Sequence, residues 1–137
     1  MNLNHMHSQF NDLAETFLSR MQETFPNESK IKIYRQQFGL VQSMNSKKPV
    51  EMFMENMFPF GEKILRRDEM FFKKDEFVGA AESISGKMGL IAYWDSINEQ
   101  TKNNIWEYIQ GLYILGMASL GYQKELQEMM IKTEFKA

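Results

Sequence analysis

The chain has 137 residues, of which 43% are hydrophobic and 25% charged, and its formal net charge is −2. This length predicts one domain that can bury a real core, and the composition argues against extensive disorder. The slightly acidic balance argues against a protein whose main role is to bind nucleic acid through its phosphates. The absence of cysteine excludes disulfides, thiol nucleophiles and cysteine-based zinc sites, and it fits an intracellular protein.

Residues 1–8 are polar, without the basic and apolar segments of a secretory signal, and we expect them to form a flexible tail. His5 and His7 are two residues apart, a spacing at which two histidines can bind one metal ion. They are the only histidines of the chain and both lie in the tail, so we predict no metal site and no other cofactor.

The first predicted helix spans residues 9–25, where apolar residues recur at helical spacing, and Pro26 ends it. The second spans residues 28–44, with Asn27 as its N-cap. Its apolar stripe is Ile31, Tyr34, Phe38, Val41 and Met44.

Basic residues gather near the second helix and the loop after it. They are read either as an ordinary solvated surface, which we favour, or as a nucleic-acid-binding face in which an aromatic ring stacks on a base. The residues of this alternative face are Lys30, Lys32, Tyr34, Arg35, Lys47 and Lys48.

Pro49 suits the first position of a third helix, and a short helix is expected over residues 62–72. The stretch 62–76 holds five acidic and five basic residues, so it is not a phosphate-binding stripe. Asp68 and Glu69 are adjacent and would point in different directions on a helix, so we expect them to pair with Arg66, Arg67 or Lys73 at the surface rather than to act in catalysis.

We predict a turn or a short helix over residues 77–86, followed by a helix over about 87–95. The Gly86-Lys87 pair lacks the second glycine and the hydroxyl residue at the spacing of a phosphate-binding loop, so that motif is absent.

Residues 94–121 contain the strongest helical pattern. Ser96 and Glu99 have the spacing of a capping box. Two adjacent apolar rows follow, and together they predict a central, largely buried helix near 97–116. The rows are Ile97, Thr101, Ile105, Ile109, Leu112 and Gly116, and Trp106, Ile109, Tyr113, Met117 and Leu120.

Three glycines of this region, Gly111, Gly116 and Gly121, lie five residues apart. They indicate either a smooth groove for a close neighbour or, as we favour, a helix end with Gly116 or Gly121 as its C-cap. The polar strip of this helix argues against a membrane span, as does the shortness of the apolar run from Leu112 to Leu120.

A short amphipathic helix over residues 122–131 and a flexible tail over residues 132–137 complete the pattern. Short loops favour antiparallel neighbours. We therefore predict an all-α, compact, single-domain bundle of about five to seven helices, with residues 9–131 as the domain.

Three stretches together resemble small α-helical proteins of nucleocytoplasmic large DNA viruses of algae and amoebae. They are Glu23-Thr24-Phe25-Pro26, Ile64-Leu65-Arg66-Arg67-Asp68-Glu69-Met70-Phe71-Phe72 and Thr101-Lys102-Asn103-Asn104-Ile105-Trp106-Glu107-Tyr108-Ile109. The resemblance implies a viral origin and a helical fold, in the host cytoplasm or the virion, and it implies no catalytic residue.

Twelve methionines and eleven phenylalanines can supply an adaptable interaction surface. The first hypothesis is therefore a non-enzymatic module that binds another protein or itself. The second is a nucleic-acid accessory protein that uses the basic residues around 30–48. An enzyme with buried carboxylates ranks last, because no set of nucleophile, base and oxyanion donors is found.

Overall fold

Helix α8, Glu99–Ser119, is the central helix of the described residues, and four other helices pack against it. The structure is a computed structural model that describes residues 3–72 and 93–135. The other helices are α1 (Leu3–Thr24), α2 (Ser29–Met44), α3 (Lys48–Met57), α4 (Gly61–Leu65) and α9 (Gln123–Lys132), with 3-10 turns at Phe58–Phe60, Glu69–Phe72 and Trp94–Ser96. The described residues contain helices and no strand, which confirms the predicted all-α, single-domain class.

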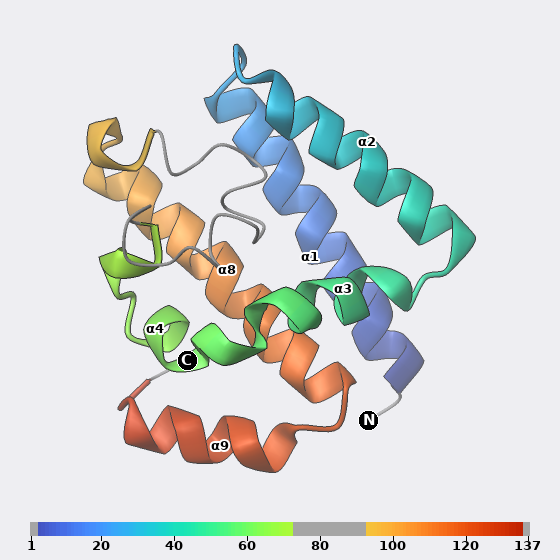
Figure 1. The fold of residues 1–137 in the computed structure, drawn as a ribbon, viewed down its shortest axis with the longest axis vertical. Helices are drawn as coiled ribbons and strands as arrows, with labels where there is room; N and C mark the ends of the chain where they lie inside the picture. Colours follow the sequence, from blue (N-terminus) through green and yellow to red (C-terminus); the bar gives the residue numbers. More distant parts are fainter. Residues whose placement is uncertain (1–2, 73–92, 136–137) are drawn as a thin grey trace.

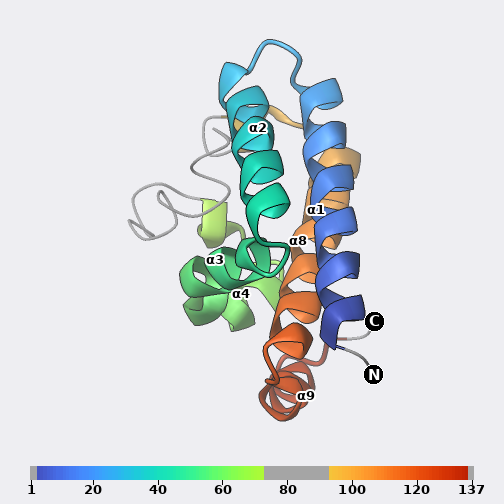
Figure 2. The ribbon, with the colours of Figure 1, turned by 90° about the vertical axis from the view of Figure 1, so that its right-hand side faces the viewer.

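The helices form two layers. Helices α1 and α8, from opposite ends of the sequence, lie side by side in one layer (Figures 1 and 2). Helices α2, α3 and α4 lie in the other layer, where α2 packs on α1 and α3 and α4 pack on α8. Helix α9 crosses the end of α8 and also contacts α4.

The core lies between the layers. Helix α8 contributes buried side chains from both of its predicted apolar rows. Trp94 and Trp106 meet edge to face with ring centroids 5.7 Å apart. Leu120 is the one member of the predicted rows that lies exposed at the surface. The buried members are Ile105, Trp106, Ile109, Leu112, Tyr113, Gly116 and Met117.

The predicted capping box at the start of α8 is wrong. Helix α8 begins at Glu99, and Asn98 is its N-cap, with the side-chain oxygen accepting a 2.8 Å hydrogen bond from the Thr101 amide. Ser96 lies in the preceding 3-10 turn and donates to the carbonyl of Tyr93. Asn98 rather than Ser96 is the N-cap because Asn98 has the extended backbone conformation of an N-cap and lies three residues before the amide that it binds.

Gly116 and Gly121 have different roles. Gly121 has φ +86°, and the amides of Gly121 and Tyr122 bond to the carbonyls of Ala118 and Met117, which is a Schellman C-cap. Gly116 lies inside the helix, where a Cβ atom would come within 2.5 Å of Met54 Sδ. The favoured role as a helix end therefore holds for Gly121, whereas Gly116 permits the close approach of α3.

Several predicted boundaries need correction. Helix α1 begins at Leu3 and buries Met6 and His7, so residues 3–8 do not form the expected loose tail. Glu28, not Asn27, caps α2, and Pro49 is the second residue of α3 rather than the first.

Two further boundaries differ from the prediction because backbone turns intervene. The expected helix over 62–72 divides into α4 and a 3-10 turn, since Arg67 has φ +53°, a left-handed conformation that ends a helix. The amides of Thr133 and Phe135 bond to carbonyls in α9, so residues 133–135 of the expected tail are held against that helix.

The predicted elements over residues 77–86 and most of 87–95 lie outside the described residues. Within the latter range, Trp94 and Asp95 lie in the 3-10 turn Trp94–Ser96.

Candidate functional site

An apolar groove runs between α2 and α3, with α1 and α8 as its floor. Its volume is about 320 Å³, which is within the range of small-molecule and side-chain pockets in proteins. We call it the α2–α3 groove. Its lining comprises Phe10, Ala14 and Leu18 of α1, Tyr34, Gln37, Phe38, Leu40 and Val41 of α2, Pro49, Met52, Phe53, Asn56 and Met57 of α3, and Leu112 of α8.

The spacing of residues on α2 explains its wall of the groove. Tyr34, Gln37 and Val41 follow one another at steps of three and four, so they share one helix face. That face is directed at the groove because the next face, with Ile31 and Arg35, packs against α1.

The described residues of the groove lining include no charged side chain. Tyr34 is the only ionisable group among them, and burial raises the pKa of the phenol to about 12, so the group is neutral at physiological pH. The amides of Gln37 and Asn56 and the Tyr34 hydroxyl are the polar groups. Such a lining favours an apolar occupant with a few hydrogen-bonding groups.

The apolar surface continues from the groove over the outer side of α2. Ile33, Leu40 and Met44 are 51%, 65% and 85% exposed, and they fall at helical steps of seven and four. We call these three residues the α2 crest. Met52 on the opposite lip is also exposed. Contiguous exposed apolar surface of this kind marks interaction sites.

The structure does not bring the six predicted nucleic-acid residues onto one face. Tyr34 lines the α2–α3 groove. Arg35 is directed at α1, where its Nε donates a 2.9 Å hydrogen bond to Glu15 and its Nη1 bonds to Gln22.

The four remaining lysines lie at the two ends of α2. Lys30 and Lys32 are in its first turn, and Lys47 and Lys48 follow its last residue. A helix of 16 residues is about 24 Å long, so the two pairs are well separated. All four side chains are exposed, and none forms an ion pair with another described residue.

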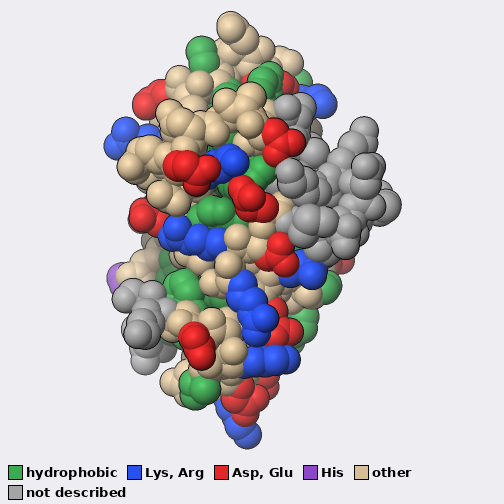
Figure 3. All heavy atoms as spheres, turned by 90° about the vertical axis from the view of Figure 1, so that its left-hand side faces the viewer, with side chains coloured by type: hydrophobic (Ala, Val, Ile, Leu, Met, Phe, Trp, Pro, Cys, Tyr) green, Lys and Arg blue, Asp and Glu red, His purple; other side chains and the backbone are tan. Residues whose placement is uncertain are grey.

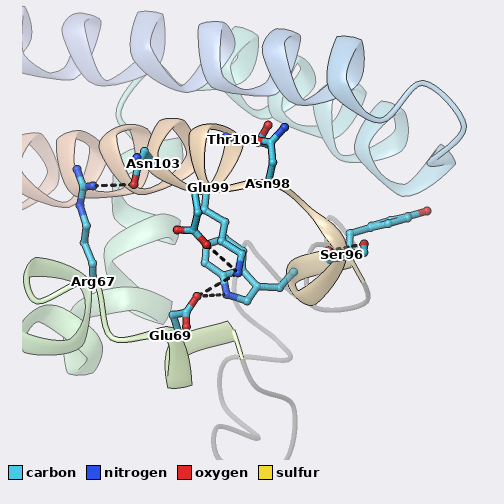
Figure 4. A network of polar contacts seen from close by, with 10 residues as sticks. Arg67, Glu69, Ser96, Asn98, Glu99, Thr101 and Asn103 are labelled. Carbon is cyan, nitrogen blue, oxygen red and sulfur yellow. Dashed lines mark hydrogen bonds and ion pairs between the residues drawn. The ribbon is translucent and has the colours of Figure 1, made fainter.

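A polar network joins the α4 end of the molecule to the start of α8 (Figure 4). The Glu69 carboxylate accepts from Trp94 Nε1 at 3.1 Å and pairs with Lys102 at 3.2 Å. Lys102 also lies 5.2 Å from the centre of the Trp94 ring. Arg67 reaches Asn103 and Gln110. These groups are engaged with one another, so the network fixes the turn after α4 rather than presenting a reactive group.

The described part of the charged segment 62–76 forms surface ion pairs, as expected. Glu62 pairs with Lys132 at 3.0 Å and with Arg66 at 4.0 Å, and the Lys132 hydrogen bond lowers the pKa of this carboxyl. Glu69 pairs with Lys102 rather than with the predicted arginines, and Lys73 lies outside the described residues. Acidic and basic side chains are intermixed on the face drawn in Figure 3.

A small buried polar cluster lies where α1 meets the α2–α3 turn. Asn11 Nδ2 donates a 2.8 Å hydrogen bond to the Ser46 carbonyl. His7 Nδ1 and Asn11 Oδ1 are buried without a protein partner. Burial and the nearby Lys47 lower the pKa of His7 below 6.5, against the opposing influence of Glu51. His5 is exposed, and no group of three potential metal ligands occurs among the described residues.

Sequence reasoning missed the groove and the crest. The available signal was the run Gln36–Met44, which contains no charged residue and has apolar side chains on both its buried and its outer faces.

None of the helices within residues 3–72 and 93–135 has the length and apolar character needed to cross a bilayer. Comparisons with protein-family models, curated proteins and solved structures found no match.

Proposed function

We propose that this chain is a non-enzymatic protein–protein interaction module and that the α2–α3 groove binds an apolar helical segment of a partner. The observation that carries the proposal is the continuity of an uncharged groove with the exposed α2 crest. Grooves between helices bind amphipathic helices through apolar side chains that repeat at helical spacing.

The exposed crest supports this role because a partner can cover it without breaking any contact among the described residues. Leu40 and Met44 add apolar area around the groove mouth, and a bound helix would remove that area from water. Met44 and Met52 have flexible, polarisable side chains, which suit a surface that adapts to a partner. Following the viral resemblance, the module would serve as a virion component or an infection-stage adaptor.

A capture experiment tests the proposal. The tagged chain, carrying a photo-crosslinking residue at Met44, is incubated in a lysate of the native source, treated with nuclease and examined by mass spectrometry. We expect one protein to be crosslinked in stoichiometric amount. Crosslinking should be lost in Leu40→Lys and retained in Ile131→Lys, a matched control because Ile131 is 79% exposed on α9. Equal crosslinking in both variants would contradict the proposed site.

The nucleic-acid reading remains the second candidate, supported by the absence of any acidic residue between Ser29 and Val50. Binding through lysines would weaken steeply as salt rises. A mobility assay at low salt with single- and double-stranded probes separates the candidates. A shift that disappears when Lys30, Lys32, Lys47 and Lys48 are all changed to glutamine would favour nucleic acid over a protein partner.

A further inference from the structure

We infer that the partner segment is an amphipathic helix whose apolar face is flanked by acidic residues. This inference rests on the proposed function and adds the chemistry of the partner. Its basis is the distribution of charge around the α2–α3 groove: the described lining of the groove and the crest are uncharged, whereas lysines lie at both ends of α2.

The lysines at the two ends flank the groove. Lys30 precedes the groove-lining residues Tyr34 and Gln37 by four and seven positions, so it extends the same helix face. Lys48 precedes Met52 by four positions and extends the opposite lip on α3. A helix lying in the groove would therefore meet a lysine near each end.

The acidic residues around the groove do not cancel this positive charge. Residues 29–50 contain five basic and no acidic side chains, and within residues 3–72 and 93–135 Arg35 alone among the five pairs with an acid, Glu15. On α3, Glu51 and Glu55 are exposed, and Glu55 follows Met52 by three positions. Glu28, the N-cap of α2, adds a third carboxylate two residues before Lys30. Four exposed lysines thus oppose three glutamates at the ends of α2 and on α3, and the excess is one positive charge.

Two other occupants fit less well. A second copy bound through the same surface would bring two faces with the same net positive charge together, and like net charges disfavour association. An anionic bilayer would satisfy the lysines and the crest, but a flat surface would leave the 320 Å³ groove beneath them unfilled. An acidic amphipathic helix satisfies the groove, the crest and the lysines together.

The test uses fluorescence anisotropy of the full chain with helical peptides of equal length. All carry the same leucine anchors at i, i+4, i+7 and i+11, and their flanking residues are glutamate, glutamine or lysine. At low salt we expect the glutamate-flanked peptide to bind about tenfold tighter than the glutamine-flanked one, with the difference shrinking as salt screens the charges. The double variant Lys30→Glu with Lys48→Glu should reverse the order, and Leu40→Lys should weaken all binding.

Each other outcome overturns the inference in a distinguishable way. Equal affinities that Leu40→Lys abolishes would overturn the acidic partner while leaving the groove as an interaction site. Preference for the lysine-flanked peptide, or no binding by any peptide, would also overturn it, and the Met44 crosslinking result would then decide the proposed function alone. Binding to vesicles of phosphatidylserine and phosphatidylcholine that requires Leu40 would replace the helix with a membrane surface. Sedimentation of the free chain as a dimer that Leu40→Lys dissociates would replace it with a second copy.

Discussion

The side-chain amide of Gln110 donates a 3.1 Å hydrogen bond to the main-chain oxygen of Ile64, and so fastens the centre of α8 to the end of α4. The same nitrogen reaches the Leu65 oxygen at 3.3 Å, and the Gln110 oxygen accepts from Arg67 Nε at 3.3 Å. One buried amide therefore donates to the Leu65 carbonyl and adds a second donor to the Ile64 carbonyl, which also accepts from the Arg67 amide. It also holds Arg67, whose left-handed backbone turns the chain.

The first prediction concerns this amide. Gln110→Leu should lower the free energy of unfolding by about 1–3 kcal/mol, because the buried Leu65 carbonyl would lose its side-chain donor and the Ile64 carbonyl would keep only its main-chain donor. Urea denaturation measures the change. Gln100→Leu is the control, since Gln100 is exposed on the same helix and should change stability by less than about 0.5 kcal/mol. Equal effects would show that the Gln110 bonds contribute nothing specific.

The second prediction compares two glycines. A Cβ atom at Gly61 would collide with the hydroxyl of Tyr113 and with Met129 Sδ, whereas one at Gly39 meets nothing within 4 Å. Gly61→Ala should therefore destabilise the fold by about 1–3 kcal/mol, because Tyr113 is buried and cannot move without straining its bond to the Phe58 carbonyl. Gly39→Ala should stabilise it by about 0.5–1 kcal/mol, since alanine favours an exposed helix interior. Thermal unfolding of both variants checks the opposite signs.

The third prediction concerns pH. The pKa of His7 is lowered in the folded state, so below pH 6.5 the unfolded chain takes up a proton that the folded chain resists. This contribution to stability is complete above pH 6.5 and is lost as the pH falls towards the lowered folded pKa. Urea midpoints measured between about pH 8 and pH 5 should decline for the wild type, and His7→Gln should flatten that decline.

Exposed His5 on the same helix provides the control for this measurement. His5→Gln should keep the wild-type decline. If His7→Gln also keeps the decline in stability with falling pH, the burial of His7 does not cause that decline. The lowered pKa of Glu62 makes stability fall with acid in the same direction, but only when the pH approaches the ordinary carboxyl value of 4.5, below the window of His7.

The fourth prediction separates the floor of the α2–α3 groove from its lip. Leu112 is fully buried and Leu40 is mainly exposed. Leu112→Ala should therefore cost about 2–5 kcal/mol of stability, whereas Leu40→Ala should cost little, because few contacts are lost at the surface. Chemical denaturation provides the measurement. A large loss in Leu40→Ala would mean that the crest supports the fold, and Leu40 variants could not then report on binding alone.

The sequence by itself determined the three long helices and most of the residues that they bury, although Met44 of the predicted α2 stripe is exposed. In α1, α2 and α8 the apolar residues repeat at the helical period, and Phe17, Ile31 and Ile109 are buried as that period predicts. The reason is local: a helix places residues three and four apart on one face, so a sequence pattern reports burial without any knowledge of the neighbour.

The tertiary structure alone decided what those faces pack against and which apolar residues remain outside. Burial of apolar surface has no preferred direction, so the pattern of α2 could not show that α3 leaves a groove beside it or that Leu40 stays exposed. Arg35 belonged to a basic cluster in the sequence, but Glu15, twenty positions earlier, turns it towards α1. Such long-range contacts fixed the candidate site, whereas short-range periodicity fixed the helices from which it is built.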